Sequence, residues 1–299
     1  MTGFLAEIAK RAAGRWLDLL VLPGALWVAT VVLGLRLGHA HAFAPSRLST
    51  WIDHQASRPG GHDAAGILLI SAAILACAAA AGLAASALGV AVQRWRTLPG
   101  RRGLSRLAVA LRLRRWNRTD RRYREAFVAA AASTAAARPA ADRRIHAAHA
   151  AHVRLGETAP TRPTWIGDRF STTGARIHAD FGLDLDHVWP RLWVILPEPL
   201  RTDLSAAQDA YATASRRTAW GVMYAFVAVV WWPALAIGAA VIVAGETRSR
   251  TAAVALTDLI CASVELYVTD LADRLGITAT RPLQRSDGLE MMKALIVIR

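Results

Sequence analysis

The side chains best suited to chemistry in this sequence are three histidines spaced three residues apart. His146, His149 and His152 occur in the alanine-rich stretch HAAHAAH, where a helix spreads them over about a third of its circumference. Two imidazoles on one helix can share a transition metal when another ligand completes the coordination shell. No carboxylate or thiol is spaced for that purpose. We therefore interpret the stretch as a solvated helix with incidental histidines and predict no metal site in it.

The other patterns of reactive residues in the sequence are also incomplete. No serine or cysteine has the surroundings of an activated nucleophile, and no Walker-type or dinucleotide-binding glycine pattern occurs. Cys77 and Cys261 lie in an apolar run and in a helical pattern, which is typical of small hydrophobic side chains. A second set of histidines falls in one loop: His39, His41, His54 and His62. We predict no catalytic residues, no cofactor and no metal at this loop.

Arginine is the chemically distinctive residue of the chain. Lys10 and Lys293 are the only lysines among 36 basic residues, and the net charge is +14. From Arg94 to Arg154, 16 arginines stand against three acidic residues. Interleaved aromatic side chains would suit a nucleic acid. However, the segment directly follows an apolar run, so anionic lipid is the nearest polyanion, and it binds juxtamembrane arginines with about 1 kcal/mol each.

We therefore predict that this segment binds anionic lipid headgroups and not nucleic acid. The residues assigned to the lipid-binding site follow the apolar run closely: Arg94, Arg96, Arg101, Arg102, Arg106, Arg112, Arg114 and Arg115.

Three long apolar runs must position these arginines, since 54% of the chain is hydrophobic. Residues 16–37 and 65–92 are each long enough to span a bilayer, because about 20 helical residues cross its hydrocarbon core. Basic residues flank the outer ends of this pair of runs. The positive-inside rule therefore places the N-terminus and residues 94–217 in the cytoplasm, with residues 39–63 outside. We predict a multi-pass protein of the inner (cytoplasmic) membrane.

The third apolar run, residues 218–245, has Trp231-Trp232-Pro233 at its centre. Proline interrupts the hydrogen-bond ladder of a helix, tryptophan prefers the membrane interface, and arginines stand on both flanks of the run. We favour a membrane hairpin with these three residues at its tip over a single kinked span, because the hairpin leaves both flanks in the cytoplasm. Each arm is short for a full crossing. The hairpin is therefore either re-entrant or an extension of helices that begin in the cytoplasm.

The remaining segments are expected to be helical and cytoplasmic, which makes the fold an all-α integral membrane protein. No stretch alternates with a period of two, so no strand is expected. Near the C-terminus, apolar residues recur every three or four positions from Leu256 to Leu275, and Gly276 ends that helix. The predicted parts are the transmembrane pair 1–93, the arginine-rich segment 94–160, a helical region 161–217, the hairpin 218–245, and a helix with its tail 246–299.

A short apolar helix is expected around the segment WPRLW. Its apolar face has the spacing i, i+3, i+4 and i+7 and consists of Trp189, Leu192, Trp193 and Leu196. Arg191 lies off that face, and Pro190 suits the first turn of a helix, where its missing N–H is no loss. The helix is too short to span a membrane. We expect it either to brace the cytoplasmic part against the bilayer surface or to be a core helix of a cytoplasmic bundle.

Several short motifs follow one another between residues 160 and 276. They are Pro163-Thr164, Gly167-Asp168, Phe181-Gly182-Leu183-Asp184, Trp189-Pro190-Arg191-Leu192, Leu196-Pro197, the 218–245 run, and a closing helix from Asp258 to Leu275. In this order they resemble a family of uncharacterised bacterial membrane proteins. The resemblance implies a membrane hairpin around Pro233 followed by a closing helix, and it implies no activity.

These observations predict a non-enzymatic, membrane-anchored scaffold or partner-binding protein, which acts on a protein partner or as a homo-oligomer. The alternative is a small oligomeric channel or transporter, in which the hairpin lines a path through the membrane. We rank the channel second because a pore needs polar residues inside the membrane, and the apolar runs offer almost none apart from Ser71 and Thr218.

Overall fold

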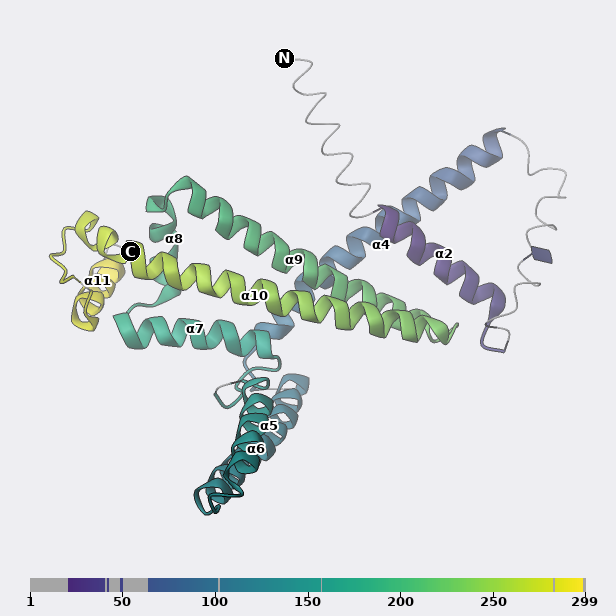
Figure 1. Ribbon diagram of the computed structural model, residues 1–299. Coiled ribbons are helices and arrows are strands. Elements are labelled where there is room, and N and C mark those ends of the chain that lie inside the picture. The colour runs from purple at the N-terminus through teal and green to yellow at the C-terminus, as the bar shows by residue number, and fades with distance from the viewer. Residues whose placement is uncertain are drawn as a thin grey trace. The chain divides into compact units, whose positions relative to one another are not determined.

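In the computed structural model, 83% of the described residues are helical and none of them forms a strand (Figure 1). The described residues are 21–40, 42, 49–50, 64–101, 103–156, 158–281 and 283–297. Among the predicted features, Arg102, three of the loop histidines (His41, His54 and His62) and the first residues of the 16–37 span lie outside these ranges. The all-α fold is confirmed for the part of the chain that is described.

The chain divides into two compact units, which are considered separately below. The first unit comprises residues 1–92 and 212–248, and the second comprises residues 93–211 and 249–299. Three long helices contribute residues to both units: α4 (Ala64–Thr97), α9 (Glu198–Val227) and α10 (Pro233–Arg274).

In the first unit, α2 (Leu22–Leu37) packs closely on α4 through small residues. Gly24 lies so near the backbone of Ala78 that a Cβ atom could not be added without a clash. Further along α4, the buried Ala81 and Ala85 contact Trp220 of α9. Small residues let helix backbones approach closely, which is the usual way in which helices pack inside a membrane. The leucine and isoleucine side chains of α4 lie on its exposed surface.

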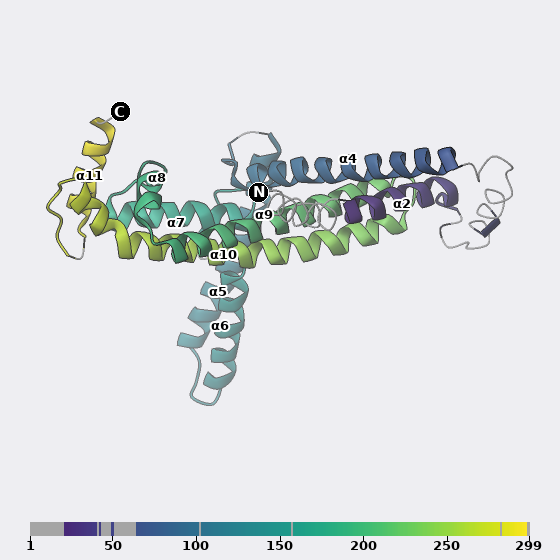
Figure 2. The same ribbon diagram turned by 90° about the horizontal axis from the view of Figure 1, so that it is seen from above.

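The 218–245 run forms two antiparallel helices and not one kinked helix. Helix α9 ends at Val227, α10 begins at Pro233, and Figures 1 and 2 show the two helices side by side. A Cβ atom at Gly238 would lie 2.8 Å from the Gly221 carbonyl oxygen, and one at Gly245 would lie 2.7 Å from the Thr218 nitrogen. These pairings leave no space between the helices. Both arms are parts of longer helices. Helix α9 begins at Glu198, before the apolar run, and α10 runs through Gly245 without a break.

The tip of this hairpin lies beside the C-terminal end of α2. Gly34 packs against the side chain of Trp231, and a ring nitrogen of His39 is 2.7 Å from the Val230 carbonyl oxygen. The indole N–H of Trp231 donates to the carbonyl of Ala42 at 3.2 Å. Residues 228–232 therefore lie at the same end of the first unit as residues 34–40 and Ala42.

The second unit is built around a hydrophobic core between the C-terminal half of α10 and three shorter helices. These are α7 (Trp165–Phe181), α8 (Leu185–Ile195) and α11 (Arg285–Val297). Val264, Val268 and Leu271 of α10 are buried in this core, and Leu256, Ile260, Tyr267 and Leu275 pack against it. The predicted apolar stripe of the closing helix is thus its buried face. Gly276, with φ of 72°, follows the end of that helix.

The WPRLW segment lies in α8, whose start differs from the prediction. Asp184 caps the helix by accepting from the N–H of Asp186 at 3.0 Å, so α8 begins at Leu185 and Pro190 falls inside the helix and not in its first turn. Leu192 and Leu196 are buried in the core of the second unit, and Trp189 and Trp193 pack against it. The packing supports the core-helix alternative over the membrane brace.

Candidate functional site

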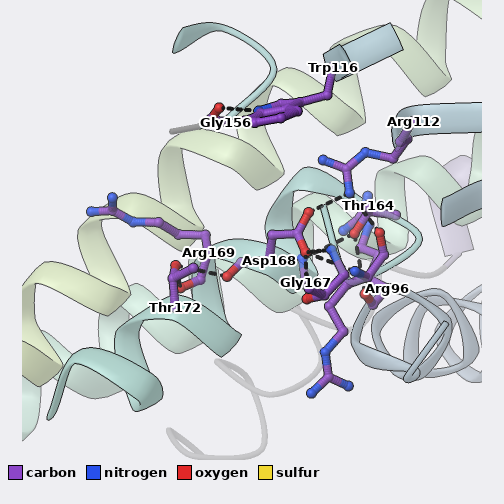
Figure 3. A network of polar contacts seen from close by, with 11 residues as sticks. Arg96, Arg112, Trp116, Gly156, Thr164, Gly167, Asp168, Arg169 and Thr172 are labelled. Carbon is purple, nitrogen blue, oxygen red and sulfur yellow. Dashed lines mark hydrogen bonds and ion pairs between the residues drawn. The ribbon is translucent and has the colours of Figure 1, made fainter. Parts of the chain in front are cut away.

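The densest polar network of the second unit forms where α7 begins (Figure 3). Thr164 caps α7 by accepting from the N–H of Gly167 at 3.1 Å. Asp168, in the first turn, accepts from the backbone N–H groups of Thr161 and Arg162, both at 2.8 Å. The other carboxylate oxygen of Asp168 pairs with Arg112 at 2.5 Å. One carboxylate therefore holds the preceding loop and an arginine from another helix.

The end of α4 joins the same network through Arg96. The Arg96 carbonyl oxygen accepts from the Thr164 hydroxyl at 3.3 Å, and it faces Gly167 so closely that a methyl group would not fit there. The Arg96 side chain is 1% exposed, with its guanidinium carbon 6.0 Å from the centre of the Tyr211 ring. This contact is a cation–π arrangement. The network thus fastens the end of α4 to α7.

The structure divides the eight arginines of the predicted lipid-binding site. The side chains of five are exposed: Arg94, Arg101, Arg106, Arg114 and Arg115. Arg96 is buried, and Arg112 is bound to Asp168 and to the Arg162 carbonyl oxygen at 2.7 Å. Because the side chains of Arg96 and Arg112 are held in protein contacts, the five exposed arginines are the ones that present their side chains to solvent. Arg102 lies outside the described residues.

Of the three histidines of HAAHAAH, His146 and His149 are exposed, as predicted for a solvated helix, whereas His152 is buried in a helical hairpin. The hairpin consists of α5 (Gly103–Ala131) and α6 (Arg138–Val153). His152 is buried, 4.9 Å from the Trp116 ring and stacked on Tyr123 at 6.1 Å. His149 lies 5.2 Å from Tyr123. Within the described ranges, no group of three potential metal ligands comes together.

An open groove of about 620 Å³ runs between α7 and α10. Two ion pairs cross it, from Arg169 to Asp258 at 2.7 Å and from Arg176 to Glu265 at 3.0 Å. From the first ion pair to the second, the position moves seven residues forward in α7 and seven residues forward in α10, so the two helices run parallel here. Cys261 also lines the groove, and burial raises the pKa of its thiol, with the nearby charges as smaller influences. A thiol that stays protonated is a poor nucleophile, and the two carboxylates that line the groove, Asp258 and Glu265, are paired with arginines.

Sequence reasoning missed these long-range contacts because the partners are far apart in the chain. The Asp168 network joins residues about 60 positions apart, and the ion pairs of the groove join residues about 90 apart. The motifs on which the resemblance rests include Thr164, Gly167-Asp168 and Asp258. The first three of these residues lie in the Asp168 network, and Asp258 lies in the groove. Their spacing alone did not connect them with Arg112 or Arg169.

Comparison with protein-family models, with curated proteins and with solved structures gives no match for this chain. The resemblance to uncharacterised bacterial membrane proteins therefore stays a prediction. The fold itself defines a class: an all-helical protein with two helices, α4 and α10, that are long and apolar enough to cross a membrane, and with α2 as a shorter apolar helix.

Proposed function

We propose that this chain is an integral protein of the cytoplasmic membrane and that it holds a helical scaffold at the inner surface. The observation that carries the proposal is the surface of α4. Its most apolar stretch has a mean hydropathy of 2.5, yet only 17% of that stretch is buried. A core helix of a water-soluble protein would bury its leucines, whereas a helix that contacts lipid leaves them on its surface.

The geometry of the first unit supports the proposed topology. The hairpin tip and the end of α2 lie together, as they would if both faced the outer side. At the other end of the unit, Gly89 of α4 lies against Arg216 of α9, where the positive-inside rule puts the cytoplasm. The N-terminus and the second unit are then cytoplasmic. The exposed arginines that follow α4 contact anionic headgroups in this arrangement.

A scaffold accounts for the hairpin better than a channel does. Gly221, Gly238 and Gly245 bring the backbones of α9 and α10 into direct contact, which leaves no path between them. Thr218 is buried and donates to the Ala214 carbonyl of its own helix, and Ser71 is exposed on α4. Neither residue borders an open path in the part of the chain that the structure describes. The channel therefore stays the second candidate and requires a pore between several copies.

Cysteine accessibility tests the topology. In a Cys77→Ala, Cys261→Ala background, Ser49→Cys precedes the second span and Ala136→Cys lies in the turn between α5 and α6; both positions are exposed. An impermeant maleimide applied to intact spheroplasts should label Ser49→Cys, and it should label Ala136→Cys only after lysis. Labelling of Ala136→Cys in intact spheroplasts, or release of the protein by alkaline carbonate, would contradict the proposal. Ion flux through liposomes that contain the purified protein would instead support the channel.

A further inference from the structure

The first turns of α5 expose an apolar stripe that no other part of the second unit covers in the described structure. Leu104, Leu107 and Leu111 are 76%, 58% and 51% exposed. Their spacing of three and four residues puts them on one face of the helix. Just before α5, Trp95 and Leu98 are exposed as well. Leucines that recur on one exposed face mark a surface that binds something apolar.

Contacts on the opposite face of α5 fix the direction of this stripe. Ser105 is buried, and its hydroxyl donates to the Pro99 carbonyl at 3.3 Å. Arg112 is held by Asp168, and the indole N–H of Trp116 donates to the Gly156 carbonyl at 3.0 Å. Val109 packs against Gly100. Turning the leucines inward would break all of these contacts, so the stripe stays on the outside of the folded unit.

The same face of α5 changes from apolar to cationic along the helix. Arg114 and Arg118, three and seven residues after Leu111, continue the line of the leucines and are exposed. Arg101 is exposed just before α5, and Arg115, four residues after Leu111, is exposed on the same face as the leucines. The surface therefore offers leucines for an acyl layer and guanidinium groups for anions. An anionic bilayer surface combines both, and α4, the most apolar helix of the chain, ends shortly before α5 begins.

We propose that the first turns of α5 form an in-plane membrane anchor. Leu104, Leu107 and Leu111 enter the acyl region of an anionic leaflet, while Arg101, Arg114 and Arg115 reach the headgroups along their flexible stems. The inference rests on the proposed function, because a bilayer reaches this surface only if α4 spans it. It also separates two roles within α5: the start binds lipid, and the remainder pairs with α6 through the aromatic and histidine side chains.

The test uses an environment-sensitive fluorophore on single cysteines of the full chain, without Cys77 and Cys261, in proteoliposomes. The anchor probe is Leu107→Cys, the matched control is the exposed Ala147→Cys on α6, and Leu83→Cys on the exposed surface of α4 reports spanning. Doxyl-labelled lipid should quench the Leu107 probe several-fold more than the Ala147 probe in vesicles that contain phosphatidylglycerol. Arg114→Gln with Arg115→Gln should reduce that quenching.

The outcomes separate the inference from the proposed function. If the Leu83 probe is quenched and the Leu107 probe is quenched no more than the Ala147 probe, the anchor is overturned and the membrane assignment stands. If the Leu83 probe is not quenched, the membrane assignment fails, and the anchor fails with it. Equal quenching of the Leu107 probe in purely zwitterionic vesicles would overturn the role of anionic headgroups.

Discussion

The guanidinium of Arg112 and the carboxylate of Asp168 form a 2.5 Å ion pair between helices that are joined by a long stretch of chain. Arg112 also donates to the Arg162 carbonyl oxygen at 2.7 Å. Because Asp168 at the same time accepts two backbone N–H groups of the loop before α7, the pair connects α5, that loop and α7. Charge-assisted hydrogen bonds of this kind are about twice as strong as neutral ones.

Replacement of Asp168 by alanine should therefore destabilise the second unit. The pair is largely but not fully shielded, with side-chain exposures of 21% for Arg112 and 14% for Asp168, so we expect a loss of about 2 kcal/mol in the free energy of unfolding. Urea unfolding of the detergent-solubilised protein measures it. Asp142→Ala, at an exposed position of α6, is the control. Equal stability of the two variants would show that the network contributes little.

Two glycines of α7 should respond in opposite directions to substitution by alanine. At Gly167 a methyl group meets the Arg96 carbonyl oxygen, whereas at Gly174 it meets open space. We expect Gly167→Ala to cost about 1–3 kcal/mol through overpacking, and Gly174→Ala to stabilise the helix by up to about 1 kcal/mol. Thermal unfolding of the two variants measures both changes in stability. A stable Gly167→Ala protein would mean that α4 and α7 separate there readily.

The hairpin offers a similar pair of glycines. Gly238→Ala should force α9 and α10 apart and lower the melting temperature, because its Cβ would lie 2.8 Å from backbone atoms of both Gly221 and Ala225. The expected cost is about 1–3 kcal/mol. Gly66→Ala in α4, where nothing lies within 4 Å, serves as the control and should melt like the parent. If both variants melt alike, the two helices are not packed as described.

Neighbouring aliphatic residues of α8 test whether the WPRLW helix belongs to the core. Leu192 is fully buried, whereas Val194 is largely exposed. Leu192→Ala should cost about 3 kcal/mol, from lost transfer free energy and a residual cavity. Val194→Ala should change stability by less than about 0.5 kcal/mol. A larger effect at Val194 than at Leu192 would point to an interface on the opposite face of α8.

The attachment of α11 should weaken in acid because of Asp287. Hydrogen bonds from the Thr280 hydroxyl at 2.5 Å and its N–H at 3.0 Å, and from the Gln284 N–H at 3.2 Å, lower the pKa of this carboxyl group. Its contribution is therefore complete above the unfolded pKa of about 3.9 and is lost as the pH falls through the lower folded value. The protection of the α11 amides, that is, their exchange rate relative to the intrinsic rate at each pH, should fall over that range. In Asp287→Asn this protection should already be low at neutral pH and should lack the acid-induced step.

Local signals predicted the helices well and their partners poorly. The stripe from Leu256 to Leu275 indicated its buried face, because helical periodicity is a property of neighbouring residues. Pro233 likewise indicated the break between α9 and α10, because a proline interrupts the helix at its own position in the chain. In contrast, Arg96 and Arg112 share their surroundings in the sequence with exposed arginines. What distinguishes them is the position of Tyr211 and Asp168 in the fold, and no local pattern contains that information.

The start of α8 is an intermediate case. Asp184 caps the start of α8, and the left-handed Gly182, with φ of 71°, ends α7. The prediction for this helix depended on the apolar spacing from Trp189 onward, and that spacing does not define where the helix begins. The exposed face of α5 depends on the contacts of Ser105 and Arg112, which hold the opposite face inward.

The direct backbone contact at Gly221 and Gly238 has a consequence for biosynthesis. The apolar part of α9, residues 218–227, is shorter than the roughly 20 residues by which a nascent segment is recognised as a membrane span, whereas α10 is long and apolar enough to cross a membrane. In the proposed topology we therefore expect α9 to enter the bilayer together with α10, because the two backbones meet without intervening side chains. Insertion of α9 would then wait until the ribosome has completed α10.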